Sequence, residues 1–91
     1  MGEYLEDKIR EIVNTLLKGF DEEFILKKLE VKDKGRVGLV RVFIDKPGGI
    51  TIDDCAKISK ELSVQLDIAD PMKGPFRLEV SSPGISNEEE L

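Results

Sequence analysis

Residues 76–81 read Phe-Arg-Leu-Glu-Val-Ser, and this short stretch decides the fold. Apolar and polar side chains alternate along it, which is the pattern of a strand with one buried face. The turn Ser82-Pro83-Gly84 ends the strand. Because a whole helix is predicted before it, the strand cannot join its predecessor through a hairpin, and it must enter the sheet by a crossover.

That helix occupies the segment in front of the strand. Thr51 is a candidate N-cap, and the carboxylates of Asp53 and Asp54 can meet the unpaired N–H groups of the first turn. A single apolar stripe runs along the helix and consists of Cys55, Ile58, Leu62 and Leu66. The dipeptide Asp70-Pro71 closes it, because the residue before a proline avoids the α region.

Two strands are predicted upstream of this helix, over residues 23–32 and 37–45. Side chains alternate in the second strand, with Val40, Val42 and Ile44 on one face and Arg41 and Asp45 on the other. The connection Asp33-Lys34-Gly35-Arg36 is polar and contains a glycine. The two strands should therefore form an antiparallel hairpin.

A first helix is predicted over residues 3–18. Its apolar positions follow the helical period and are Leu5, Ile9, Ile12, Val13, Leu16 and Leu17. The order is then helix, strand, strand, helix, strand. We expect an α+β fold of two layers, with both helices on one face of a three-stranded sheet. The pattern leaves open whether strand 76–81 pairs with the first strand or the second.

Composition narrows the classes of function. The chain has 91 residues, which suffices for one domain with one core. It contains one cysteine and no histidine, which excludes Cys/His zinc sites and His-based catalytic triads, and no cofactor is expected. The N-terminus lacks a signal peptide and no apolar run could cross a bilayer, so we expect a cytoplasmic protein without membrane contact.

The net charge of the chain indicates which kind of partner it binds. The net charge of −5 is unusual for a protein that clamps bare RNA, and it favours a basic protein partner. The hairpin region is nevertheless rich in lysine and arginine. Candidate RNA contacts are Lys27, Lys28, Lys34 and Arg36. Lysines on strand edges also prevent unwanted strand pairing, so both interpretations stay open.

Three motifs have simpler structural explanations. Asp53 and Asp54 could be paired carboxylates, but adjacent helical residues diverge by about 100°, which favours a role at the helix start. Residues 35–38 spell the GxxG of KH domains, yet they fall on a hairpin rather than between two helices. Cys55 and the turn at Ser82 lack a histidine base, so a nucleophile is disfavoured.

Four blocks of the sequence resemble the N-terminal domain of the RimP family. They are Val-Phe-Ile-Asp at 42–45, Gly-Ile-Thr-Ile-Asp-Asp-Cys-Ala-Lys-Ile-Ser at 49–59, Leu-Asp-Ile-Ala-Asp-Pro at 66–71 and Leu-Glu-Val-Ser-Ser-Pro-Gly at 78–84. The resemblance implies an αββαβ domain similar to the KH type II arrangement, followed in the family by a small Sm-like or SH3-like barrel. It also implies a non-catalytic assembly factor that binds the maturing small ribosomal subunit and contacts the twelfth small-subunit protein.

Under this interpretation the domain spans residues 1–84, and residues 85–91 form an acidic tail in place of the Leu-Asp-Arg-Pro-Leu segment that leads to the barrel. The expected state is a monomer. Candidate partner contacts are Arg41, Asp45, Asp53, Arg77, Glu79, Ser81, Ser82, Pro83 and Gly84. A stand-alone KH-like RNA-binding module is the alternative, and a hydrolase or metal enzyme is the weakest hypothesis.

Overall fold

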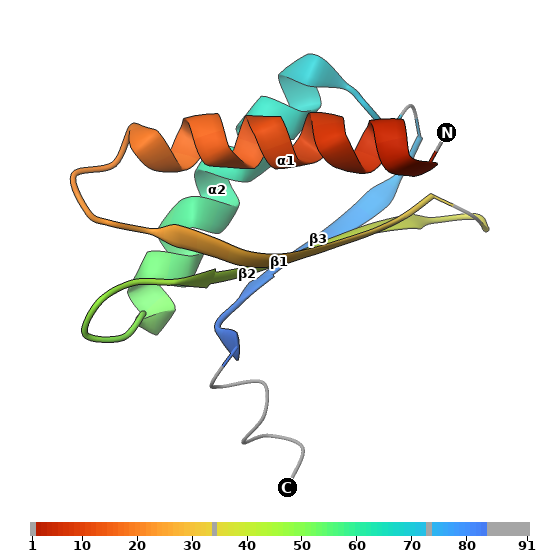
Figure 1. The fold of residues 1–91 in the computed structure, drawn as a ribbon. Helices are drawn as coiled ribbons and strands as arrows, with labels where there is room; N and C mark the ends of the chain where they lie inside the picture. Colours follow the sequence, from red (N-terminus) through yellow and green to blue (C-terminus); the bar gives the residue numbers. More distant parts are fainter. Residues whose placement is uncertain (1, 34, 73, 84–91) are drawn as a thin grey trace, which may run out of the picture.

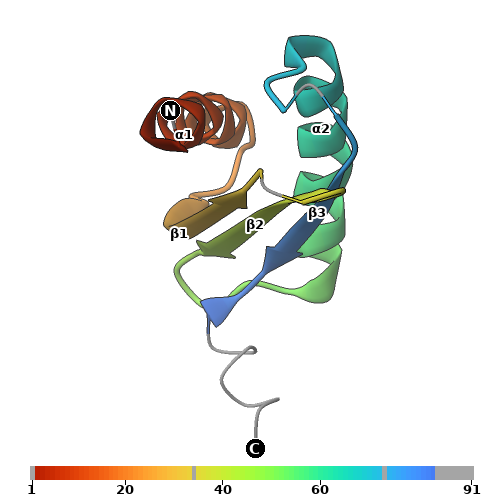
Figure 2. The same cartoon turned by 90° about the vertical axis from the view of Figure 1, so that its right-hand side faces the viewer.

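The computed structural model describes residues 2–33, 35–72 and 74–83. Its elements are, in order, α1 (Gly2–Lys18), β1 (Ile25–Lys32), β2 (Gly38–Asp45), α2 (Ile52–Ala69) and β3 (Phe76–Ser81). Both helices lie on the same face of the sheet (Figures 1 and 2). The predicted two-layer α+β fold is therefore confirmed.

The three strands form one mixed sheet in the order β1-β2-β3. β1 and β2 are antiparallel, as expected for a hairpin, whereas β3 runs parallel to β2. The neighbour of the last strand, which the sequence pattern left open, is thus β2. Helix α2 forms the crossover that a parallel connection requires. The β1–β2 register shifts between Leu26 and Lys28, so Lys27 stands in a bulge or similar irregularity.

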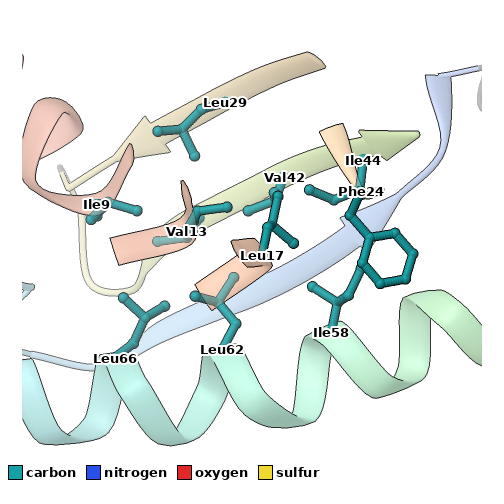
Figure 3. Packing of buried hydrophobic residues seen from close by; sticks show 11 residues of the cluster. Ile9, Val13, Leu17, Phe24, Leu29, Val42, Ile44, Ile58, Leu62 and Leu66 are labelled. Atoms are coloured by element: carbon teal, nitrogen blue, oxygen red, sulfur yellow. The ribbon is translucent and has the colours of Figure 1, made fainter. Parts of the chain in front are cut away.

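The core lies between the sheet and the two helices. Val40, Val42 and Ile44 on β2 are completely buried, which confirms the predicted inner face. They face Ile58, Leu62 and Leu66 of α2, and the α1 side chains Ile9, Val13 and Leu17 complete the layer (Figure 3). Each such side chain stabilises the fold by roughly 1.5 to 3 kcal/mol relative to full exposure. Cys55, Leu16 and Leu78 are only half-buried at its margin.

The start of α2 is fixed by a capping box. Thr51 Oγ1 accepts a hydrogen bond from the backbone N–H of Asp54 at 3.0 Å, and Asp54 Oδ2 accepts one from the N–H of Thr51 at 3.1 Å. At the other end Asp70 adopts a left-handed conformation with φ of 49° and donates its N–H to Leu66 O. The interpretation of Asp54 as a helix-start residue is confirmed.

The GxxG segment belongs to the hairpin. Gly35 has a φ of 90°, and Gly38 is the first residue of β2. The backbone N–H of Gly38 donates to Pro75 O at 2.9 Å, so this glycine sits where the hairpin meets the segment that leads into β3. The segment thus joins two strands, unlike the KH loop, which joins two helices.

Candidate functional site

One face of the sheet carries no helix in the described part of the chain (Figure 2). We call it the open face. The strand registers place eleven residues on it: Ile25, Lys28, Glu30 and Lys32 of β1, Leu39, Arg41, Phe43 and Asp45 of β2, and Arg77, Glu79 and Ser81 of β3. The outward residues of β2 are all half-buried, because only their neighbours within the sheet cover them.

Arg41 lies at the centre of the open face and is held by a carboxylate on each side. Its Nη1 is 3.0 Å from Glu30 Oε1, and its Nε is 2.9 Å from Glu79 Oε1. Lys28 Nζ lies 3.2 Å from the second oxygen of Glu30. The hydrogen bond from Lys28 lowers the pKa of Glu30, and the hydrogen bond to Glu79 raises the pKa of Arg41. Both shifts favour the charged forms of Glu30 and Arg41.

Apolar side chains adjoin this charged row. Phe43 follows Arg41 by two positions on β2, and Lys28 Nζ lies 5.7 Å from the centre of its ring. Leu39 precedes Arg41 by the same step and has Lys32 and Arg77 as its cross-strand neighbours. An aromatic ring and an arginine near the centre of a patch, with polar residues around them, are the usual composition of an energetically important protein interface.

A second charged cluster ties the α1–β1 connection and the residue after β2 to the start of helix α2. Lys46, just after β2, contacts Glu22 from the α1–β1 connection and lies 2.8 Å from Asp54 Oδ2 in the first turn of α2. Lys57 Nζ is 3.1 Å from the other oxygen of Glu22. Lys46 Nζ also lies 5.4 Å from the centre of the Phe24 ring. The cluster fixes the base of the loop between β2 and α2.

The hydrogen bond from Lys46 is the main reason that the pKa of Asp54 falls to about 2, and the bond from the Thr51 backbone adds to it. Asp54 is only 5% exposed, so its charge needs these partners. In return, Asp54 and then Glu22 raise the pKa of Lys46. We interpret the cluster as structural, because each of its charges is matched within the domain.

The family model for the RimP N-terminal domain matches residues 12–86. The chain belongs to this family. The match covers β1 to β3, α2 and the second half of α1, so it includes the whole open face of this RimP N-terminal domain. A domain of a ribosome maturation factor is therefore the coarse functional assignment.

Five of the predicted partner contacts come together on the open face of the RimP domain. They are Arg41, Asp45, Arg77, Glu79 and Ser81. Asp45 accepts a hydrogen bond from the N–H of Lys46 at 2.8 Å, so part of its capacity serves the local turn. Asp53 is exposed on α2 and lies apart from this group.

The turn that follows β3 offers a partner less surface than its sequence indicated. Ser82 is 8% exposed, so its side chain offers a partner almost no surface. Pro83 is half-buried, and Gly84 falls outside the described residues. Whether these positions contact a partner stays a prediction.

The basic residues of the hairpin do not form one compact patch. Lys27 and Lys28 lie near the start of β1 and Arg36 lies in the turn beyond its end, while Lys34 falls outside the described residues. A strand rises about 3.3 Å per residue, so Lys28 and Lys32 alone are roughly 13 Å apart. Lys28 is also paired with Glu30. These residues remain a prediction as RNA contacts.

The described residues contain neither a metal-binding cluster nor a membrane-spanning helix. No group of three or more Asp, Glu and Cys side chains there is placed to hold a metal ion. No helix there is long and apolar enough to cross a membrane.

Sequence reasoning missed Glu30 and the Lys46 cluster. Glu30 was detectable in principle, because it lies as far before the centre of the hairpin as Arg41 lies after it. The partners of Lys46 lie in the α1–β1 connection and in the first turn of α2, and no periodic pattern of the sequence indicates that these segments meet.

Proposed function

We propose that this domain binds the maturing small ribosomal subunit through a ribosomal protein, with the open face as its contact surface and without catalysis of its own. Membership of the RimP family carries the proposal, and the uncovered Arg41 row beside Phe43 supports the choice of surface. The twelfth small-subunit protein is the proposed partner, and the cytoplasm is the proposed compartment. In the parent protein a barrel domain would follow.

The chemistry of the open face suits a protein partner better than a polyanion. Glu30 and Glu79 flank Arg41, and Lys28 pairs with the second oxygen of Glu30, so these four charges balance and leave no net positive charge at the centre to attract a polyanion. A nucleic-acid backbone laid across the face would meet these carboxylates. A basic protein can instead place its cations near them and an apolar side chain near Phe43.

Binding of immature small subunits to the immobilised chain tests the proposal. We expect Phe43→Ala and Arg41→Gln each to weaken binding about tenfold or more, the loss seen when a central interface residue is removed. Tyr4→Ala and Lys8→Gln are matched controls, because they remove an exposed aromatic side chain and an exposed charge on α1. Equal binding by all four variants would refute the assignment of the surface.

RNA binding is a second candidate, favoured by one observation. Lys32, Leu39 and Arg77 are cross-strand neighbours at the hairpin end of the open face, and no ion pair within the described ranges neutralises Lys32 or Arg77. Affinity for a ribosomal RNA fragment should then fall steeply with salt. Reversing Arg77 should flatten the slope of log K against log salt by roughly 0.7 to 0.9. An absence of binding at low salt excludes this candidate.

A further inference from the structure

The outer side of β3 is an open sheet edge. In the described ranges β3 pairs only with β2, so the backbone groups on its other side have no strand beside them. The strand is six residues long, which corresponds to roughly 20 Å of edge. A row of unpaired N–H and C=O groups is a template on which another extended segment can add.

The two edges of the sheet differ in how well they are protected. β1 forms the other edge and carries the register irregularity at Lys27 together with exposed lysines at Lys28 and Lys32, all of which hinder strand addition. β3 has an uninterrupted register with β2, and it contains no proline and no lysine. The β3 edge is thus the accessible one.

The inner side chains of β3 are incompletely covered. Phe76, Leu78 and Val80 point to the core side of the sheet, yet all three are only half-buried. Their neighbours on β2, which include Val40 and Val42, are completely buried. A fourth strand beside β3 would cover the inner side chains, and this burial would stabilise the complex.

The side of helix α2 turned away from α1 carries small side chains. Lys57 contacts Glu22, and Gln65 lines the groove shared with α1, so both mark the side of α2 that faces α1. Two residues along a helix correspond to about 200°, which turns Ser59 and Ser63 to the opposite side, above β3 and beyond it. Figure 2 shows α2 over this end of the sheet. Small serine side chains do not block an added strand.

Charge indicates which kind of segment fits. Asp67 on the half of α2 turned away from α1 and Asp70 at its C-cap are exposed carboxylates, against one exposed lysine, Lys60. On β3 itself Glu79, which is paired with Arg41, and the exposed Arg77 carry opposite charges. The whole chain carries −5, so a second copy would approach with the same negative charge. A basic segment is attracted where a second copy is repelled.

We propose that the β3 edge receives an extended basic segment of a partner protein as a fourth strand. Alternate side chains of that segment would be apolar and would cover Phe76, Leu78 and Val80 below α2. Of the intervening side chains, the one beside Glu79 on the open face would be lysine or arginine. The proposal rests on the proposed function only in taking the partner to be a protein.

A synthetic peptide of alternating valine and lysine, labelled with fluorescein, tests the proposal by anisotropy against the full chain. Two further peptides carry N-methyl groups on every valine nitrogen or on every lysine nitrogen. Because successive N–H groups of a strand point to opposite edges, only one of the two modifications can block the side that meets β3. We expect that peptide to bind at least tenfold more weakly, and the other to bind within about twofold of the parent.

Protein variants supply the matched comparison. Glu79→Lys should weaken binding of the unmodified peptide about tenfold, whereas Glu61→Lys, the same charge change at an exposed site on α2, should have about a twofold effect. Hydrogen exchange should show slower exchange of alternate β3 amides when the peptide is bound.

Three results would overturn the proposal: no binding of the unmodified peptide, equal loss with both methylated peptides, or a stable dimer of the chain that the peptide does not disrupt. None of these measurements uses ribosomal particles, so the proposal can fail while the proposed function holds, and the reverse.

Discussion

Gly38→Ala should destabilise the domain, although glycine is a poor strand residue. A Cβ atom at this position would lie 2.6 Å from Met72 Cε, 3.0 Å from the backbone oxygen of Lys32 and 3.4 Å from Phe76 Cβ. The Met72 methyl group is the end of a flexible side chain and can move. The Lys32 oxygen belongs to the end of β1 and can yield only if the hairpin shifts.

The size of the effect follows from two opposing contributions. Overpacking of a filled site typically costs 1 to 3 kcal/mol. Because the Met72 side chain is flexible, we take the lower half of this range, about 1 to 2 kcal/mol. Replacing glycine with alanine restricts the unfolded chain and returns about 0.4 to 1 kcal/mol. The net loss is therefore about 1 kcal/mol, which corresponds to a fall in Tm of about 4 to 8 °C for a domain of this size.

Thermal unfolding followed by circular dichroism measures this loss. Gly74→Ala is the matched control, because no heavy atom of the described residues lies within 4 Å of its Cβ position and its φ is not positive. We expect this control to keep or raise Tm. In a Met72→Ala background the cost of Gly38→Ala should shrink, since one of the close contacts is gone. A Gly38→Ala protein as stable as the wild type would refute the reasoning.

Three further predictions concern the core, the start of α2 and the cysteine. Leu62→Ala should lower the free energy of unfolding by roughly 2 to 5 kcal/mol in urea titrations, whereas Val64→Ala, at a half-exposed site on the same helix, should change it little. Since the folded pKa of Asp54 lies near 2, below its ordinary value, its contribution to stability is complete above about pH 5 and is lost on acidification towards pH 2. Asp54→Asn should therefore show a shallower fall of Tm over that range, and an unchanged fall would contradict the assignment. Burial and the neighbouring Asp54 raise the pKa of Cys55, so its reaction with a disulfide reagent at pH 7 should be slower than that of a free cysteine and should accelerate on unfolding in urea.

The type and orientation of each element could be predicted because they depend on short-range order. The alternation at Val40, Val42 and Ile44 specifies a strand and its inner face without reference to the rest of the chain. The stripe from Ile58 to Leu66 does the same for α2. The neighbour of β3 could not be obtained in this way, because a crossover through a helix permits several positions in the sheet.

The candidate site was predictable only in part for the same reason. Alternation places Arg41, Arg77 and Glu79 on one face, and the structure brings them together there. The pairing of Arg41 with Glu30 depends in addition on the register of the hairpin. The half-burial of Leu78, which lies on the predicted buried face of strand 76–81, reflects the edge position of β3, which only the sheet order reveals.

The open face and the β3 edge share Glu79, and this yields a prediction that separates the two surfaces. Arg41 neutralises Glu79 through a hydrogen bond of 2.9 Å, so Arg41→Gln leaves the carboxylate uncompensated. A basic peptide at the β3 edge should then bind about two- to fivefold more tightly, within the range of exposed ion pairs, and the gain should vanish at high salt. Binding of immature small subunits through the open face should instead weaken, because the central arginine is gone. Opposite signs from one substitution require two distinct contacts, whereas changes of equal sign would mean that a single surface accounts for both.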